Sequence, residues 1–541
     1  MGDNMMKKSK SALFWGTVLF LSILSVLPAA PALAQKDGGM LRYPISAEPR
    51  STDPHNWYND KNSNTVSQHI YQTLIGADKD LKFFPELATS WKMAPDFKSC
   101  TFTLRKGVKF HDGTPFDARA VEANFNRIAT DKPSCWQNVE KWYKSTEVLD
   151  DYTIKINLER VYTPFLTEMC YAYTRIISPA ALKKYGDKVG QNPSGTGPWK
   201  FSEWIPGDRI ILTRNPDYWG GAPRLDGITF KITPEATARL MGFESNTFDI
   251  IDEPSLVDIG RLVDSKKYIF QTADSGELFA LMFNCVASPL DQKMVRQAIA
   301  YAINRPAIMK SLLSDRVLPA DAFGPAYLSD TLIKKGAYDY NPAKAKEILK
   351  TQGWTPGADG ILGKDGKRLE FKIMTPSGRY PMDRQIAEAV QANLKAVGID
   401  AKVDVVEAAA FLKWLRASKE ELAKSGIGMA LRRRPSGVSL DSAFTQHFHS
   451  QYGPPAGNNS GFYSNKQLDE YLMKAPSIAN DAERKEMYRR AQEILFDELP
   501  LVPFYYYLAA MFNWPYVKEI GIFKTVMGPT PYVSNRTWMD K

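Results

Sequence analysis

Three consecutive arginines, Arg432, Arg433 and Arg434, have the clearest chemical preference in this sequence. A guanidinium stays charged and forms paired hydrogen bonds with carboxylates and phosphates, so the run repels an ammonium group and favours an anion. The sequence leaves two interpretations. The arginines are either an anion-recognising element in a binding cleft or a solvated basic loop.

Two histidine motifs suggest other chemistry. His447 and His449 offer two imidazoles to a metal, but no cysteine or acidic run joins them, which favours an ordinary polar loop. His111 and Asp112 are adjacent, and neighbouring residues on a strand point to opposite faces, so they are a poor catalytic pair. The chain has neither a G-x-S-x-G nucleophile motif nor a G-x-x-x-x-G-K-[ST] phosphate loop. We therefore expect no catalytic residue, no metal site and no cofactor.

The elements that would position these residues alternate between strands and helices. Strand-like patterns occupy residues 101–104, 153–158, 210–213 and 228–232. One helix is predicted with Asp383 as its N-cap and Gly398 at its end, with Ile386, Val390, Leu394 and Val397 on one face. A second is predicted from Asp481 to Leu499, with Met487, Ala491, Ile494 and Leu495. This pattern indicates the α/β class.

Two short motifs read as turns. Asp112-Gly113 before Pro115 is typical of a strand–turn–helix junction. Gly195-Thr196-Gly197-Pro198 predicts a turn that lets the backbone pass close to another surface. A phosphate loop is not expected there, because a strand-like stretch and no helix follows the glycines.

Length and composition indicate a globular protein with two or three core-forming units. The chain has 541 residues, of which 44% are apolar and 24% charged. Its net charge of +9 falls to +7 without residues 1–34, which carry three lysines and one aspartate. No basic run is long enough to argue for nucleic-acid binding.

The N-terminus reads as a secretion signal. Three lysines precede an apolar run at residues 12–27, and Ala32-Leu33-Ala34 matches a cleavage site, so the mature chain is expected to begin near Gln35. A run of 16 residues is shorter than the ~20 that a spanning helix needs. No cysteine follows the cleavage site to carry a lipid, which favours a free periplasmic protein.

Four cysteines would meet an oxidising compartment: Cys100, Cys135, Cys170 and Cys285. Their spacings match no zinc pattern. Cys135 and Cys170 flank a segment with two strand-like stretches and are the disulfide candidate. The alternative is four unpaired buried thiols, because pairing cannot be deduced from sequence alone.

Five ordered segments resemble the solute-binding proteins of ABC importers, in the large peptide-type class (family 5). They are LRKGVKFHDGTPFDARAVEANFNRI at 104–128, GTGPWKFSEWIPGDRIILTRNPDYWGG at 195–221, FNCVASPLDQKMVRQAIAYAINR at 283–305, TPSGRYPMDRQIAEAVQANLKAVGI at 375–399, and the run 465–506 that includes NKQLDEYLMKA and DAERKEMYRRAQEILFDELPLVPFYY. The resemblance covers nearly all of the mature chain.

The resemblance implies a two-lobed α/β fold whose first lobe carries an extra subdomain. The first-lobe core would comprise residues 35–72, 196–284 and 506–541, the extra subdomain 73–195, and the second lobe 285–505. Two connecting segments, near Phe283-Asn284 and near residues 504–506, would form a hinge that closes around a ligand.

The same resemblance implies the function and the partners. The protein would capture a peptide or similar polar solute between its lobes and deliver it to an ABC permease in the inner membrane, as a monomer and without chemistry. Alternatives are a receptor for opines, sugar derivatives or metal chelates, a chaperone-like protein that binds extended chains, and a secreted hydrolase, which needs a nucleophile and base that the sequence does not show.

Candidate ligand-binding residues also follow from the resemblance. Relatives often hold a peptide's amino terminus with an acidic residue in a second-lobe loop, and here Arg432, Arg433 and Arg434 replace it. Arg379 precedes a helix bordering the cleft, or pairs with Asp383. Three more candidates lie in a loop that approaches the ligand in relatives, where aromatic rings could stack on the solute or instead pack in the core: Trp57, Tyr58 and Asn59.

Overall fold

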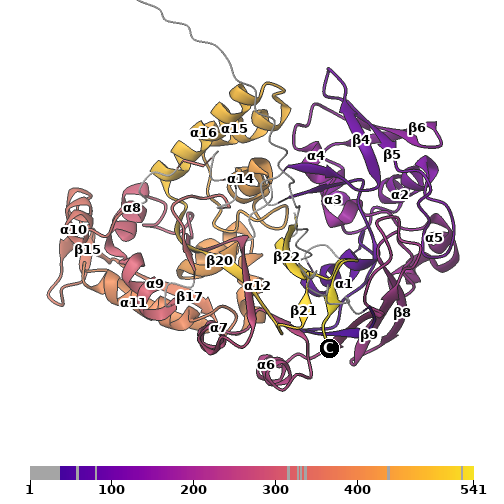
Figure 1. The fold of residues 1–541 in the computed structure, drawn as a ribbon. Coiled ribbons are helices and arrows are strands. Elements are labelled where there is room, and N and C mark those ends of the chain that lie inside the picture. Colours follow the sequence, from indigo (N-terminus) through magenta and orange to yellow (C-terminus); the bar gives the residue numbers. More distant parts are fainter. Residues whose placement is uncertain are drawn as a thin grey trace, which may run out of the picture. The chain divides into compact units, whose positions relative to one another are not determined.

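The structure, a computed structural model, describes residues 37–541 except 57–59, 79–81, 314–316, 326–327, 329–331, 334–337, 435–438 and 526–527 (Figure 1). The predicted signal peptide and the candidates Trp57, Tyr58 and Asn59 therefore lie outside the described residues. Residues 37–541 form one unit by their internal contacts. Within the described part of the chain, every helix is too short or too polar to cross a membrane.

A four-stranded sheet is built from the segments predicted for the first-lobe core. Its order is β1 (Met40–Ile45), β10 (Gly227–Ile232), β9 (Arg209–Arg214) and β8 (Trp199–Ile205), with β1 and β10 parallel. Alternate residues such as Leu41, Tyr43, Ile210 and Leu212 are buried against α1 (Lys61–Ile70). The strands predicted at 210–213 and 228–232 are confirmed.

A second four-stranded sheet lies within the segment predicted as the extra subdomain. Its order is β4 (Ala88–Met93), β5 (Ser99–Leu104), β7 (Thr153–Leu158) and β6 (Tyr143–Asp150). Helix α2 (Ala118–Asp131) begins at Asp117, whose side chain accepts from the amide of Ala120, and its apolar face packs on this sheet. Both predicted strands are confirmed here.

The largest sheet carries the candidate site. Its main path is β11 (Ile250–Asp252), β20 (Leu501–Asn513), β12 (Ile269–Phe283), β19 (Ile427–Arg434), β17 (Glu370–Pro376) and β18 (Asp400–Val406), with β13 (Leu318–Pro319) beside β20. Strands β12 and β20 are much longer than their neighbours. They pair with each other from Ile269 and Asn513 to Met282 and Leu501, with a register shift between Asp274 and Leu278.

Helices around this sheet follow the predicted patterns. Helix α11 (Asp383–Lys395) buries Ile386, Val390 and Leu394, but its N-cap is Met382, one residue before the Asp383 we predicted. Helix α16 (Asp481–Glu498) is capped by Asn480, and Leu499 ends it in a left-handed conformation before Pro500.

The remaining elements are shorter or peripheral: β2 (Ile75–Ala77), β3 (Phe83–Pro85), α3 (Trp136–Val139), α4 (Phe165–Glu168), α5 (Pro179–Tyr185), α6 (Ala236–Glu244), α7 (Leu256–Ser265), α8 (Lys293–Ala302), α9 (Arg305–Leu313), α10 (Pro342–Thr351), β14 (Thr355–Pro356), β15 (Leu362–Lys364), β16 (Lys367–Arg368), α12 (Ala408–Leu415), α13 (Lys419–Lys424), α14 (Leu440–Phe448), α15 (Lys466–Lys474), β21 (Val517–Lys518), β22 (Gly521–Thr525), β23 (Gly528–Tyr532) and β24 (Trp538–Met539). Short 3-10 turns occur at Ala172–Thr174, Gly186–Gln191, Ser450–Tyr452 and Ala475–Ser477.

The glycine turn at residues 195–198 passes against the end of α1, as predicted. A Cβ on Gly197 would lie 2.5 Å from the carbonyl oxygen of His69, closer than real contacts allow. His111 Nε2 lies 2.9 Å from the carbonyl oxygen of Gly197, while Asp112 accepts from Ser194 Oγ at 3.1 Å. His111 and Asp112 therefore hold this junction through separate partners.

The predicted disulfide between Cys135 and Cys170 is absent, since both cysteines are free thiols. Cys135 is fully buried, and its amide donates to the carbonyl of His55. The thiol of Cys170 donates to the carbonyl of Leu166 at 3.4 Å. Each cysteine is thus held by its own neighbours. Cys100 and Cys285 are also free.

Candidate functional site

The arginine run lies in a strand and not in a loop. Arg432, Arg433 and Arg434 end β19, where they pair with Ala280, Phe279 and Leu278 of β12. Side chains alternate along a strand, so Arg432 and Arg434 share one face while Arg433 points to the other. The expectation of a solvated basic loop is wrong for the first and third arginines, which are 8% and 3% exposed.

Arg433 has an ordinary surface environment. Its side chain is 41% exposed, and Nη1 forms an ion pair with Glu277 Oε2 at 3.2 Å. Its guanidinium also lies 5.6 Å from the ring centre of Tyr507. Glu277 and solvent compensate the charge of Arg433, so this arginine does not need an anion from a ligand.

Arg432 is buried against uncharged groups. Its Nη1 lies 3.1 Å from Ser460 Oγ and 3.7 Å from Met282 Sδ, and its Nε has no hydrogen-bond partner among the described residues. Burial lowers the pKa of Arg432, because the charged form loses hydration without gaining a carboxylate.

Arg434 is buried more deeply beside it. Its Nη2 donates to the carbonyl oxygens of Phe323 and Ala443, and its guanidinium lies 4.5 Å from the ring centre of Phe448. Its Nε and Nη1 have no hydrogen-bond partner within the described part of the chain. Burial, with repulsion from Arg432, lowers the pKa of Arg434 to about 9.

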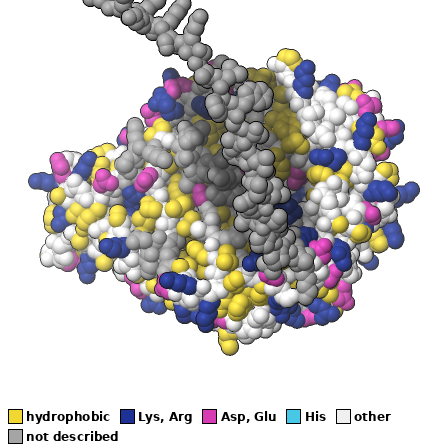
Figure 2. Space-filling model, viewed as in Figure 1, with side chains coloured by type: hydrophobic (Ala, Val, Ile, Leu, Met, Phe, Trp, Pro, Cys, Tyr) yellow, Lys and Arg dark blue, Asp and Glu magenta, His cyan; other side chains and the backbone are white. Residues whose placement is uncertain are grey.

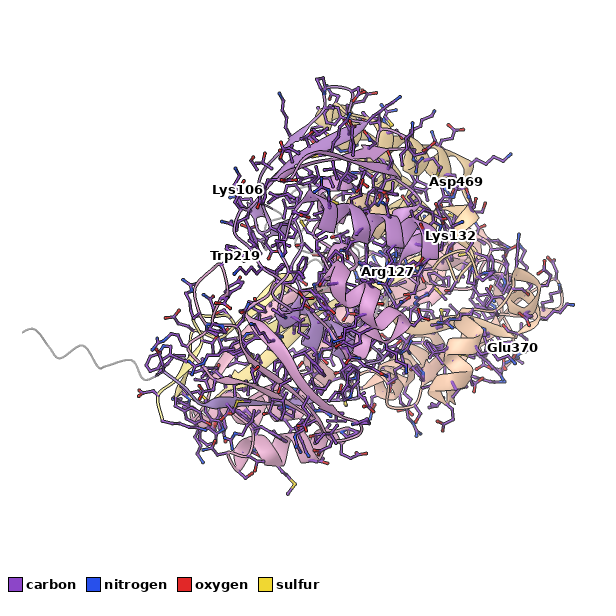
Figure 3. The ribbon with its side chains drawn as sticks, turned by 90° about the vertical axis from the view of Figure 1, so that its right-hand side faces the viewer. Lys106, Arg127, Lys132, Trp219, Glu370 and Asp469 are labelled. Atoms are coloured by element: carbon purple, nitrogen blue, oxygen red, sulfur yellow. The ribbon has the colours of Figure 1, made fainter. Side chains whose placement is uncertain are left out.

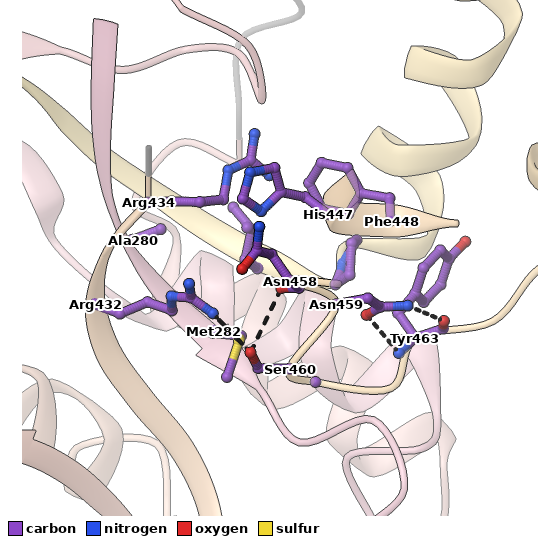
Figure 4. Close-up of a pocket in the computed structure, with 13 residues that line it drawn as sticks. Ala280, Met282, Arg432, Arg434, His447, Phe448, Asn458, Asn459, Ser460 and Tyr463 are labelled. Atoms are coloured by element: carbon purple, nitrogen blue, oxygen red, sulfur yellow. Dashed lines mark hydrogen bonds between the residues drawn. The ribbon is translucent and has the colours of Figure 1, made fainter. Parts of the chain in front are cut away.

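Both guanidiniums line one pocket (Figure 4). It is small, with about 20 Å³ of space for the centre of a water-sized sphere. Its walls come from β12, β19, the end of α14 and the loop that follows. The lining residues are Ala280, Met282, Arg432, Arg434, His447, Phe448, Asn458, Asn459, Ser460, Gly461, Tyr463, Pro500 and Leu501. These lining residues include no Asp or Glu, so the walls supply no carboxylate to either arginine.

The loop at residues 458–461 is a part of the site that sequence reasoning missed. Asn459 fixes it, because Nδ2 donates to the carbonyl of Tyr463 at 2.7 Å while Oδ1 accepts from the amide of Tyr463 at 3.1 Å. This holds Ser460 against Arg432, as Figure 4 shows. The sequence signal that could have found it is the polar run Asn458-Asn459-Ser460.

The two histidines proposed and rejected as metal ligands separate in the structure. His447 lines the pocket from α14, whereas His449 caps the next turn and lies 3.7 Å from Asp469. Over the described residues, no group of three His, Cys, Asp or Glu side chains is arranged to hold a metal ion.

The backbone of the same strand has an unpaired edge beside the pocket. Strand β17 pairs with β19 only as far as Ala430, whereas β12 pairs with it to Arg434. Among the described residues, no strand is therefore paired with the second edge of residues 431–434, although β17 itself continues two residues beyond Met374. Unpaired strand edges bind other extended chains through main-chain hydrogen bonds.

Arg379 lies on the surface in the bend after β17, and its guanidinium is 5.8 Å from the ring centre of Tyr380. The alternative partner, Asp383, instead accepts from the amides of Tyr380 and Arg384. The structure therefore does not form the predicted ion pair between Arg379 and Asp383.

The segment before Trp57 is anchored from α2 (Figure 3). Arg127 forms two hydrogen bonds with Asp53, at 2.7 and 3.1 Å, and a third with His55 Nδ1 at 2.9 Å. Burial alone would raise the pKa of Asp53, but the bonds from Arg127 hold it below its usual value. The backbone just before the candidate loop is therefore fixed by Arg127.

Comparison with known families and structures identifies the architecture. Residues 82–454 match the family model described as bacterial extracellular solute-binding proteins, family 5, middle region. The chain belongs to this family. The predicted resemblance is therefore confirmed, and so is its two-lobed α/β fold. Family 5 proteins are solute-binding proteins and not enzymes, which agrees with the lack of a recognised catalytic motif.

Individual family 5 relatives cover almost the whole chain. The glutathione-binding protein GsiB of Escherichia coli strain K12 is 31% identical over 488 residues, which is 89% of this chain and 91% of the relative. The periplasmic binding protein DppA of Helicobacter pylori, solved with the peptide STSA, is 27% identical with a TM-score of 0.75 over 94% and 99% of the two chains. NikA of Brucella suis, solved with Fe(III)-EDTA, is 25% identical with a TM-score of 0.79 over 91% and 100%.

The protein is accordingly the substrate-binding component of an ABC importer. It captures a solute outside the cytoplasm and delivers it to a membrane permease.

Proposed function

We propose that the solute is a short peptide and that glutathione is its first candidate. The observation that carries this proposal is the unpaired edge of β19 at residues 431–434, next to a small pocket lined by Arg432 and Arg434. A bound peptide would lie along this edge as an added strand. Its main chain would pair with β19, and alternate side chains would point toward the pocket.

The 31% identical relative supports glutathione in particular, since it is described as glutathione-binding and aligns over 89% of this chain. A metal chelate or an opine is the second candidate. It is favoured by the buried pair Arg432 and Arg434, which would suit a compact polyanion without any need for the strand edge.

The binding residues follow from this model. Arg432, Arg434 and the 458–461 loop would contact the ligand from one lobe, and Trp57, Tyr58 and Asn59 from the other. Arg379 would contact the ligand from the bend after β17, whereas the side chain of Arg433, paired with Glu277 on the opposite face, is not proposed as a contact. We keep the lobe boundaries at 35–72, 196–284 and 506–541 for the first lobe, 73–195 for its extra subdomain and 285–505 for the second lobe.

The cellular setting is part of the proposal. The protein would act as a periplasmic monomer after cleavage near Ala34, without catalysis and without binding nucleic acid. Figure 2 supports the last point for the face in view, where basic and acidic side chains are interspersed. The secreted hydrolase interpretation loses support, because His111 and Asp112 bond to separate structural partners.

Titration calorimetry tests the peptide proposal. Purified mature protein should bind glutathione, and small-angle scattering should show compaction on binding. An analogue with a methyl group on the Cys–Gly amide nitrogen should bind about 2- to 10-fold more weakly, since one main-chain hydrogen bond is worth about 0.5–1.5 kcal/mol. Equal affinities would remove the strand-addition model. Binding of a ferric chelate or an opine in place of every peptide tried would establish the second candidate.

A further inference from the structure

We propose that the pocket formed by Arg432 and Arg434 is a subsite for two carboxylates of one ligand, which makes the protein selective for peptides ending in a dicarboxylate group. This inference rests on the proposed peptide capture and adds a charge requirement to it. The chemical class is a peptide whose C-terminal part carries two carboxylates, such as a C-terminal glutamate. Glutathione, whose second carboxylate lies beside its ammonium at the other end, would meet this subsite with its glycine carboxylate alone.

The pocket is lined by two arginines and by no acidic residue. Neither Arg432 nor Arg434 forms an ion pair within the described part of the chain, while Arg433, the residue between them, pairs with Glu277. Charged groups buried without a partner are strongly disfavoured. Two buried cations with no acid in their walls are neutralised by two negative charges from outside.

The free donors are the second argument. Arg432 Nε, Arg434 Nε and Arg434 Nη1 are buried N–H groups without a hydrogen-bond partner among the described residues. Buried donors are nearly always satisfied in a working protein, and each exception calls for an explanation. Because these donors are inaccessible to water in this structure, a carboxylate at each guanidinium would satisfy them with charge-assisted bonds once the pocket widens to admit it.

The spacing of the two arginines sets the ligand geometry. Residues two apart on a strand are separated by roughly 6.6 Å along it and face the same side. Arg432 is held by Ser460, and Arg434 by two carbonyl groups and the ring of Phe448, so neither is free to swing to one shared oxygen. Two carboxylates a few bonds apart match this arrangement better than one does.

The strand edge explains why the ligand is a peptide terminus. The pocket lies beside residues 431–434, so a chain paired with this edge would deliver a side chain and a terminal carboxylate to the same place. A terminal ammonium would be repelled there. The ligand therefore lies with its C-terminus, and not its N-terminus, toward the arginines.

The test uses two tripeptides that differ by one carboxylate, Ala-Ala-Glu and Ala-Ala-Gln, titrated into the full mature protein. Wild type should bind the glutamate peptide about 10- to 150-fold more tightly, the range for a charge-assisted bond of 1.5–3 kcal/mol. Arg432→Gln and Arg434→Gln should each reduce this preference to threefold or less. Arg433→Gln, the matched control on the opposite face, should keep it.

Different results distinguish failure of the dicarboxylate subsite from failure of peptide capture. If wild type binds both tripeptides equally well, the dicarboxylate subsite is wrong while peptide capture stands. If neither tripeptide nor glutathione binds, peptide capture itself fails. If Arg433→Gln abolishes the preference as fully as the other two variants, the pocket assignment is overturned.

A second measurement needs no variant. The melting temperature of wild type should rise with millimolar glutarate but not with its monomethyl ester at the same concentration and ionic strength. Equal shifts would contradict the need for two carboxylates. A larger shift with inorganic phosphate than with glutarate would reassign the pocket to a phosphate group and overturn the proposal.

Discussion

The hydroxyl of Tyr162 lies 3.3 Å from a carboxylate oxygen of Asp441, 279 residues further along the chain. It also lies 3.1 Å from Glu168, whose other oxygen accepts from Tyr173. Because one hydroxyl carries one proton, it can donate to only one of these carboxylates at a time. Every hydrogen bond in the contact between the 162–173 segment and α14 can therefore form when one of the two carboxyl groups, Glu168 or Asp441, is protonated.

This contact predicts a dependence on pH. Burial raises the pKa of both Glu168 and Asp441, against the attraction of Lys141 on both groups and of Arg160 on Asp441. A raised folded-state pKa adds stability that is fully present below the unfolded value, near 4, and is lost as pH rises through the folded value.

Asp441→Asn should therefore be more stable than wild type at pH 8, by about 1–3 kcal/mol if it removes one unpaired buried charge. The gain should shrink toward pH 4.5. Calorimetric melting of both proteins over this pH range measures the difference, and Asp469→Asn, an acid outside this cluster, is the control. Parallel curves for wild type and Asp441→Asn would show that the carboxyl group does not titrate in this range.

The unpaired charge of Arg432 makes its own prediction. Arg432→Met should raise the stability of the ligand-free protein by roughly 1–2 kcal/mol, because methionine keeps the apolar stem and removes a buried cation without a carboxylate. Arg433→Met should change stability by less than about 1 kcal/mol, since its ion pair is exposed. Urea unfolding measures both. A marked loss of stability in Arg432→Met would show that Ser460 and Met282 compensate the charge.

The anchor below the candidate first-lobe loop should be sensitive to substitution. Arg127→Met leaves Asp53 buried without its partner and should cost about 3–5 kcal/mol. Adding Asp53→Asn should recover part of this loss, while Lys132→Met, at the exposed end of the same helix, should change little (Figure 3). Because the pKa of Asp53 is lowered, the contribution of this pair is present at neutral pH and disappears as pH falls through that value. The free energy of unfolding of the three variants measures these effects.

The cysteines should behave as four free thiols. Cys135 is fully buried, and burial raises its pKa to about 12, so iodoacetamide should label it slowly in the native protein. All four should react after denaturation without a reductant. A cross-linked peptide containing Cys135 and Cys170 in a non-reducing digest would restore the disulfide predicted from sequence.

The sequence was informative where apolar spacing determines structure, as at Ile386, Val390 and Leu394, whose shared face predicted α11. It was misleading at Arg432 to Arg434, because three charges in a row look like a loop. Only the pairing with β12, about 150 residues away, shows that two of them are buried. The position of Ser460 against Arg432 depends on a hydrogen bond from Asn459 to Tyr463, which no periodicity reveals.

The long pairing of β12 with β20 bears on how such a protein moves. Two independent connectors would allow twisting in many directions, but these strands are hydrogen-bonded to each other along most of their length and so behave as one ribbon. Its weak point is the register shift after Asp274, where Gly276 has a φ of +69° and its amide donates to the Asp274 side chain. A two-stranded ribbon bends most easily at such a register shift, in the direction perpendicular to its plane. Opening and closing of the lobes would then follow a single direction.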